Sequence, residues 1–180
     1  YALVPKGFFP VQDTGLIQVI SEASPAISFQ AMAERQQALA DAILQDPAVA
    51  GVASFVGVDG INTTLNSGRL VVTLKPKSER GAGIVEVSAR LRERLAGVAD
   101  IKAYLQPVQD LAFESRVSRT LYQFTLSSAS SEELSAWTRR LLDRLTTAPE
   151  LEDVSSDLQN DGLEAYIAID RATASRLGVS

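Results

Sequence analysis

A pattern repeated at a fixed spacing constrains the fold of this chain more than any other feature of its sequence. Four features recur 102 residues further along the chain: Pro47 and Pro149, Val52 and Val154, Ser54 and Ser156, Asp59-Gly60 and Asp161-Gly162. A constant offset across different residue types indicates a duplicated structural unit. The chain has 180 residues, enough for two small units of this kind.

The first copy shows the element order βαββαβ. A strand is expected over 14–23, followed by a helix that Ser28 caps and Pro47 limits. The expected core stripe of this helix is Phe29, Met32, Ala33, Gln36, Leu39, Ala40, Ile43 and Leu44. The later elements are strands over 49–58, 68–75 and 101–105 and a helix with core positions Ile84, Val87, Leu91 and Leu95. This order is that of the ferredoxin-like fold, in which helices cover one face of an antiparallel sheet.

The second copy repeats the beginning of this order and stops before its final strand. A strand from Arg119 is followed by a helix from about Ser131, where Ser130 and Glu133 have the spacing of a capping box. The expected core stripe of that helix is Leu134, Trp137, Leu141, Leu142 and Leu145. Strands over 151–156 and 162–170 and the start of a helix at Arg171 complete the pattern. The predicted fold class is therefore α+β, with tandem ferredoxin-like βαββαβ subdomains of which the second is incomplete.

Composition excludes several classes of function. The net charge of −5 and the pI near 4.8 argue against nucleic-acid binding, which needs clustered cations. The chain contains no cysteine and no histidine, which removes disulfides, thiolate and imidazole metal sites, and the usual general base near neutral pH. No apolar run approaches the roughly 20 residues that cross a bilayer, so a soluble piece is expected. The glycines of 57–60 match no phosphate-binding motif, and no cofactor is expected.

Other features leave two interpretations open. The carboxylates and the series Arg90, Arg92 and Arg94 are typical of a solvated surface. Tyr122, Phe124 and Leu126 share one face of the expected strand, and they suit either the inner face of a sheet or the lining of an apolar cleft. The connection over 59–67 is either a plain hairpin loop or a mobile binding element.

Several sequence segments, taken together, resemble those of RND multidrug exporters of the MdtB/MdtC branch. They are Pro5-Lys-Gly-Phe-Phe-Pro-Val-Gln-Asp-Thr-Gly15, Leu44-Gln-Asp-Pro-Ala-Val49, Gly57-Val-Asp-Gly60, Leu74-Lys-Pro76, Arg116-Val-Ser-Arg-Thr120 and Ile169-Asp-Arg-Ala-Thr-Ala-Ser-Arg-Leu-Gly178. The resemblance spans essentially the whole chain and implies the periplasmic porter segment after the seventh transmembrane helix. The implied domains are the end of that helix and a linker over 1–13, a first porter subdomain over 14–107, a linker over 108–118, and over 119–180 a second porter subdomain interrupted where a docking-domain insertion begins.

The resemblance also implies a function, partners and site residues. It implies the substrate-binding and gating part of a proton-driven, inner-membrane pump associated with antibiotic resistance. Such a pump is a homo- or heterotrimer that works with a periplasmic adaptor and an outer-membrane channel to export small amphiphilic substrates. The implied substrate-binding residues are Tyr122, Phe124, Leu126, Val56, Ile61 and Val71. The implied switch loop contains Asp59, Gly60, Asn62, Thr63, Asn66 and Ser67. Val56, Ile61 and Val71 lie near positions that are aromatic in the best-known drug exporters, so a different substrate range is expected.

Two other classes of function compete with a non-enzymatic pump part. The first is a stand-alone ferredoxin-like module that binds a small ligand or regulates another protein. The second is an enzyme, for which the sequence offers no catalytic constellation. Apolar helices of about 20 residues encoded immediately before Tyr1 would favour the pump over both.

Overall fold

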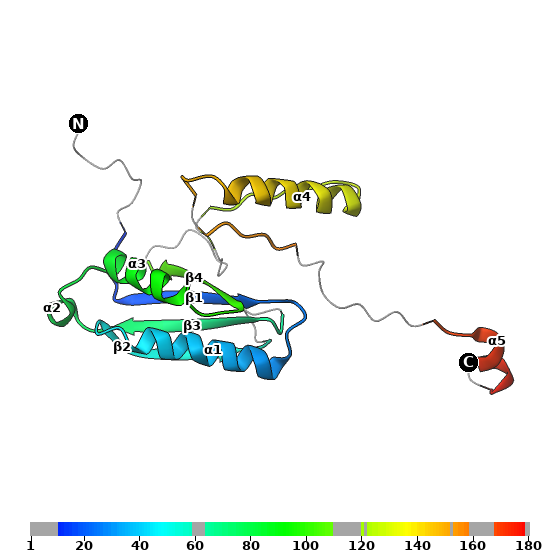
Figure 1. Cartoon of the computed structure of the whole chain (residues 1–180), viewed down its shortest axis with the longest axis horizontal. Helices are drawn as coiled ribbons and strands as arrows, with labels where there is room; N and C mark the ends of the chain where they lie inside the picture. Colours follow the sequence, from blue (N-terminus) through cyan, green and yellow to red (C-terminus); the bar gives the residue numbers. More distant parts are fainter. Residues whose placement is uncertain are drawn as a thin grey trace.

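A computed structural model describes residues 11–58, 64–109, 120, 122–151, 153–158 and 168–178 of the chain. Its elements are β1 (Leu16–Ala23), α1 (Phe29–Leu44), β2 (Val49–Val56), β3 (Ser67–Leu74), α2 (Lys77–Arg80), α3 (Ile84–Leu95), β4 (Ile101–Pro107), α4 (Ser131–Thr146) and α5 (Arg171–Arg176). Figure 1 shows α1 and α3 lying on the same face of the sheet formed by β1 to β4.

The first copy has the predicted ferredoxin-like arrangement. The strand order is β2-β3-β1-β4, and each neighbouring pair is antiparallel. Each of the two helices therefore connects strands that are not neighbours, as the split βαβ pattern requires. The α+β class and the βαββαβ order of this unit are confirmed.

The core lies between the sheet and its two helices. Every second residue of β1 is buried, and Leu70, Val72 and Leu74 of β3 face the same core. Residues of α1 and α3 at helical spacing close it from the other side. They are Met32, Leu39, Ala40 and Ile43 on α1, and Ile84, Val87, Leu91 and Leu95 on α3.

The predicted core stripe of α1 was wrong at the two ends of the helix. Ser28 caps the helix as predicted, since its hydroxyl oxygen accepts a bond from the Ala31 N–H. Phe29, however, is 55% exposed, and its ring lies beside Gly57, the residue just after β2. Leu44 is also exposed, because it follows the buried Ile43 by one residue and therefore points about 100° around the helix from it.

The arginines of α3 do not form the solvated surface that was expected. The Nε and Nη2 atoms of Arg90 lie 2.6 and 2.8 Å from the carboxylate oxygens of Asp46, just after α1. Arg94 donates to the carbonyl of Ala42 at 3.4 Å, and Arg92 lies 3.4 Å from Asp153. That interpretation of the three residues was wrong, because their long side chains reach α1 and the second copy.

Two buried or half-buried ion pairs make the stability of the chain sensitive to acid. Bonds from Arg90 to Asp46, and from Arg80 to Asp13, hold the pKa of each carboxyl below its ordinary value of 3.8. A depressed pKa in the folded state contributes stability above the unfolded value, and that contribution is lost as pH falls through the folded pKa.

We therefore expect the free energy of unfolding to fall as pH decreases below about 3.8, and Asp46→Asn to reduce this acid sensitivity. Urea unfolding at a series of pH values measures how steeply the free energy of unfolding depends on pH in the wild type and in the variant. Equal slopes for the wild type and the variant in this acid range would show that Asp46 does not contribute.

The second copy is only partly as predicted. The helix starts where expected, and the Ser130 hydroxyl accepts a bond from the Glu133 N–H. Over 122–130 and over 153–158 the backbone forms no strand, so the predicted strands are wrong for these described residues. A strand needs a neighbour to satisfy its backbone groups, and none of the described strands pairs with them.

The predicted core stripe of α4 also differs from what the structure shows. None of its residues is buried, and Trp137 is exposed with the Arg140 guanidinium 5.3 Å from its ring centroid. The predicted strand over 162–170 falls largely outside the described residues, whereas a helix does start at Arg171. Within the described ranges, no helix has the length and apolarity needed to cross a membrane.

Candidate functional site

The sheet of the first copy has an outer face, opposite α1 and α3. Strand pairing aligns Phe55, Arg69, Ile20 and Tyr104 in one row across β2, β3, β1 and β4. Because side chains alternate along a strand, these residues face away from Leu70 and Val72 in the core. The next row on the same face is Ala53, Val71, Gln18 and Gln106.

An aromatic and cationic pair occupies the β2 side of this face. The guanidinium carbon of Arg69 lies 5.0 Å from the centroid of the Phe55 ring, within the range of a cation–π contact. Phe55 is exposed, Ile20 and Val71 are half-buried, and Tyr104 is buried. This face therefore combines apolar side chains with a cationic and an aromatic group, a mixture that small-molecule sites also show where they form a cleft.

The structure places the predicted substrate residues of β2 and β3 on two different faces. Val71 lies on the outer face, but Val56 packs against the hydrophobic core opposite Gly68. Val56 is therefore not part of the outer face, because it is in phase with Val52 and Ser54. Phe55 takes that place, and alternation along β2 is the signal that could have found it.

The end of the hairpin connection that leads into β3 is held by contacts with β1 and within the connection itself. The amide of Asn66 donates to the Ala23 carbonyl, and the Ala23 N–H donates to the Asn66 carbonyl, both at 2.9 Å. Ser67 is the first residue of β3 and exchanges bonds with Thr64. These two residues of the predicted switch loop are thus buried anchors. Asp59, Gly60, Ile61, Asn62 and Thr63 lie outside the described residues.

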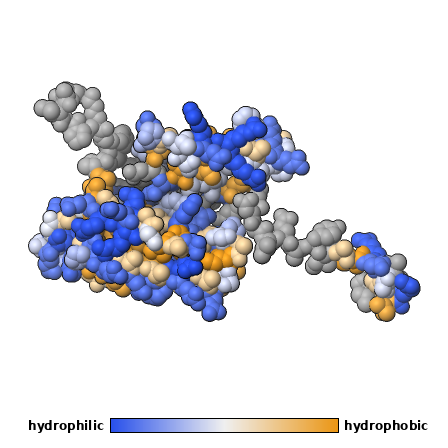
Figure 2. Space-filling model, viewed as in Figure 1, coloured by the Kyte–Doolittle hydropathy of each residue, from blue (hydrophilic) through white to orange (hydrophobic). Residues whose placement is uncertain are grey.

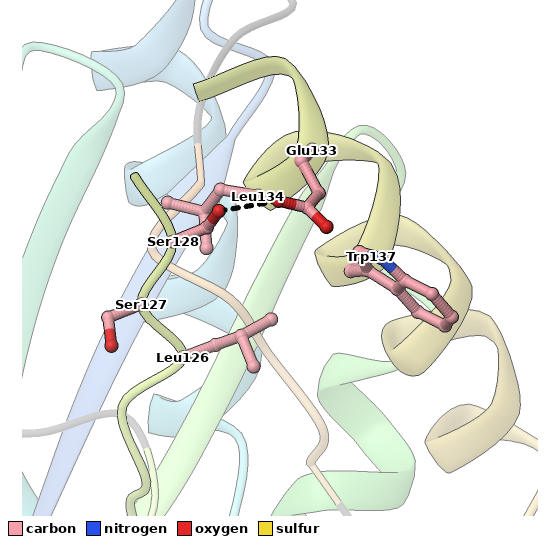
Figure 3. Close-up of a pocket in the computed structure, with 6 residues that line it drawn as sticks. All are labelled: Leu126, Ser127, Ser128, Glu133, Leu134 and Trp137. Atoms are coloured by element: carbon pink, nitrogen blue, oxygen red, sulfur yellow. Dashed lines mark hydrogen bonds between the residues drawn. The ribbon is translucent and has the colours of Figure 1, made fainter. Parts of the chain in front are cut away.

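The second group of predicted substrate residues lies elsewhere in the chain. Tyr122 is 91% exposed, Phe124 is 69% exposed, and Leu126 is exposed to a smaller extent. Leu126 and Trp137 line an open pocket of about 240 Å³. Figure 3 shows these two side chains facing each other across it. Its lining residues are Leu126, Ser127, Ser128, Glu133, Leu134 and Trp137. Figure 2 shows apolar atoms gathered along one side of α4. A role for these three residues in binding stays a prediction.

A buried polar cluster lies between α1 and the sheet, beneath the outer-face pair. Gln36 is almost completely buried, and its amide oxygen accepts a bond from the Ser21 hydroxyl. Its amide nitrogen donates to the carbonyls of Phe55 and Arg69, each at 3.4 Å. Gly68 provides room for this side chain, since a Cβ there would lie 2.7 Å from both the Gln36 amide oxygen and the Ser21 hydroxyl oxygen.

We expect Gly68→Ala to lower the free energy of unfolding by about 1–3 kcal/mol, because the added methyl group overlaps buried polar atoms. The matched control is Gly51→Ala in β2, where a Cβ meets no described atom within 4 Å. Urea unfolding compares the two. If Gly68→Ala lowered the free energy of unfolding no more than Gly51→Ala does, the buried polar cluster would be able to move aside without loss of stability.

The fold resembles part of a heavy metal efflux pump whose structure was solved in two crystal forms. One match has a TM-score of 0.79 at 20% identity, and covers 99% of this chain and 19% of the pump chain. The other has a TM-score of 0.77 at 22% identity, and covers 99% of this chain and 20% of the pump chain. The present chain thus spans about a fifth of the length of these matches.

Together with this fold, a match to a family model defines the class of protein, the RND efflux transporters. The chain belongs to the AcrB/AcrD/AcrF family, whose model matches residues 1–180.

Proposed function

We propose that this chain is the periplasmic substrate-binding and gating part of a proton-driven RND multidrug efflux pump, in a branch similar to MdtB/MdtC. One observation carries the proposal. In a chain of this family, the sheet of a ferredoxin-like unit has its outer face lined by Phe55, Arg69, Ile20 and Val71, with both helices on the other side.

The proposed mechanism is binding and conformational gating, without any bond being made or broken. A substrate shifts a conformational equilibrium only by the difference between its affinities for the two states. The outer face would supply part of one binding surface, and Tyr122, Phe124 and Leu126 would supply part of another. Movement of the unit that carries the first surface would then change the affinity for substrate.

The proposed substrates are small amphiphilic molecules. The two similar solved structures are of a heavy metal efflux pump, which raises metal ions as a second candidate. Soft metal ions are usually bound by cysteine, histidine or methionine. This chain has no cysteine, no histidine and one methionine, and that methionine, Met32, is buried in the core. Its composition therefore favours amphiphiles over metal ions as ligands of this part.

The proposed setting is the periplasmic side of a bacterial inner membrane, within a homo- or heterotrimer. The proposed partners are sibling RND subunits, a periplasmic adaptor and an outer-membrane channel. The resemblance to multidrug exporters and the membership of the family support this assembly.

Phe124→Ala in the intact pump tests the second proposed surface. Because Phe124 is exposed, we expect the variant to keep its cellular abundance and to lose export of some substrates. Resistance profiles and immunoblots measure both quantities. Leu39→Ala, in the core, is the control for lost abundance, and Val85→Ala, exposed on α3, is the control for an unaffected surface. Unchanged export of every substrate tested would remove Phe124 from the site.

A further inference from the structure

Gln36 connects the two faces of the sheet. Its amide nitrogen lies on the helix-covered side and bonds to the carbonyls of Phe55 and Arg69. These are the two residues whose side chains stack on the outer face, with 5.0 Å between the guanidinium carbon and the ring centroid. They are also direct partners in the pairing of β2 with β3. One side chain therefore holds the backbone of both members of the pair from behind.

The surroundings of Gln36 restrict its position. The side chain is 1% exposed, and the Ser21 hydroxyl donates to its amide oxygen. Ser21 belongs to β1 and pairs with Gly68 of β3, the residue before Arg69. The close approach at Gly68 leaves no space for even a methyl group. A buried amide must keep its hydrogen bonds, so the Gln36 amide has one favoured placement.

We propose that Gln36 is a positioning residue that acts through the sheet and sets the stacking of Arg69 on Phe55 at the outer face. The proposal rests on the proposed function, in which that face binds substrate. A leucine at position 36 would fill a similar volume but could not hold the two carbonyls. The spacing of β2 and β3 at this point would then relax, and the guanidinium would leave the ring.

Nuclear magnetic resonance of the 180-residue chain tests this positioning without transport. An aromatic ring shifts the resonances of protons held over its face, so the Arg69 side-chain signals report the stacking. Phe55→Leu, which removes the ring, provides the reference for its loss. We expect the Arg69 signals of Gln36→Leu to move toward those of Phe55→Leu. Gln37→Leu is the matched control, because Gln37 is exposed on the same helix and bonds to Asp41.

A purely structural role for Gln36 would predict a different result. In that case Gln36→Leu would unfold at a lower temperature, but its Arg69 signals would stay at their wild-type position. That outcome would overturn the proposal. If Gln36→Leu does not fold, Ser21→Ala removes one partner of the amide with a smaller change in shape. We then expect a partial movement of the Arg69 signals in the same direction, and unmoved signals would again overturn it.

The intact pump separates this proposal from the proposed function. We expect Gln36→Leu to change the substrate profile in the same direction as Phe55→Ala, at normal abundance. If the Arg69 signals move but neither variant changes the profile, the positioning role stands and the outer face is not a substrate surface. If the signals do not move, the positioning role fails whatever the transport result.

Discussion

Leu39→Ala is expected to lower the free energy of unfolding by about 2–5 kcal/mol, because it leaves a cavity in the centre of the core. Leu39 lies on α1 with 0% of its surface exposed, among Ile43, Leu70 and other buried residues. Since a domain of this size is stable by only about 5–15 kcal/mol, the variant should lose a large part of its stability. Urea or thermal unfolding of the 180-residue chain measures this loss.

Leu44→Ala is the matched control for that prediction. It removes the same atoms from the same helix at a position that is 53% exposed, so we expect a change within about 0.5 kcal/mol. Similar costs at the two positions would mean that α1 does not present the face to the sheet that the structure shows.

Asp46→Asn is expected to lower the free energy of unfolding by about 2–4 kcal/mol at neutral pH, because it leaves the Arg90 guanidinium without its carboxylate. The Asp46 side chain is fully buried, accepts two bonds from Arg90, and accepts a third from the Ala48 N–H at 2.9 Å. It thereby joins the end of α1 to α3. The unfolding free energy measured in urea reports the loss.

Asp100→Asn makes the same chemical change in an exposed ion pair. Asp100 pairs with Arg35 at 3.0 Å, and both side chains are exposed. Exposed pairs contribute about 0–1 kcal/mol, and asparagine tolerates the positive φ of 61° at this position. If Asp46→Asn cost no more than Asp100→Asn, the buried pair would not be a determinant of stability.

The sequence was sufficient to predict the first copy because its patterns depend on local rules. Period-two alternation in β3, helical spacing in α3 and the Ser28 cap each specify an element without knowledge of its neighbours. These elements also pack on one another, so local preference and tertiary contacts agree. Burial at the ends of α1 depends on where the sheet stops, which explains why Phe29 and Leu44 were misjudged.

The second copy shows the opposite case. Residues 122–126 have a clear strand pattern, but a strand forms only when another strand satisfies its backbone groups. None of the described strands pairs with them, and a pattern read along one segment carries no information about that partner. The helix α4 forms nonetheless, because its backbone bonds and its Ser130 cap lie within the segment itself.

The placement of the predicted site residues also depends on tertiary structure, and their role in binding stays a prediction. Val71 lies on the outer face, whereas Val56 is one residue out of phase with that face and packs against the core. The Gln36 cluster could not be predicted, because Ser21, Gln36 and Gly68 meet only through the packing of α1 on β1 and β3.

Substrate protection at position 71 tests the central claim most directly. The chain has no cysteine, so Val71→Cys in an otherwise cysteine-free pump places one thiol on the outer face. Val85→Cys places the same group on the exposed surface of α3 as a control. The rate of labelling by a maleimide is measured with and without a transported amphiphile. We predict that the amphiphile slows labelling at position 71 and not at position 85. Equal rates at position 71 with and without the amphiphile would contradict the account.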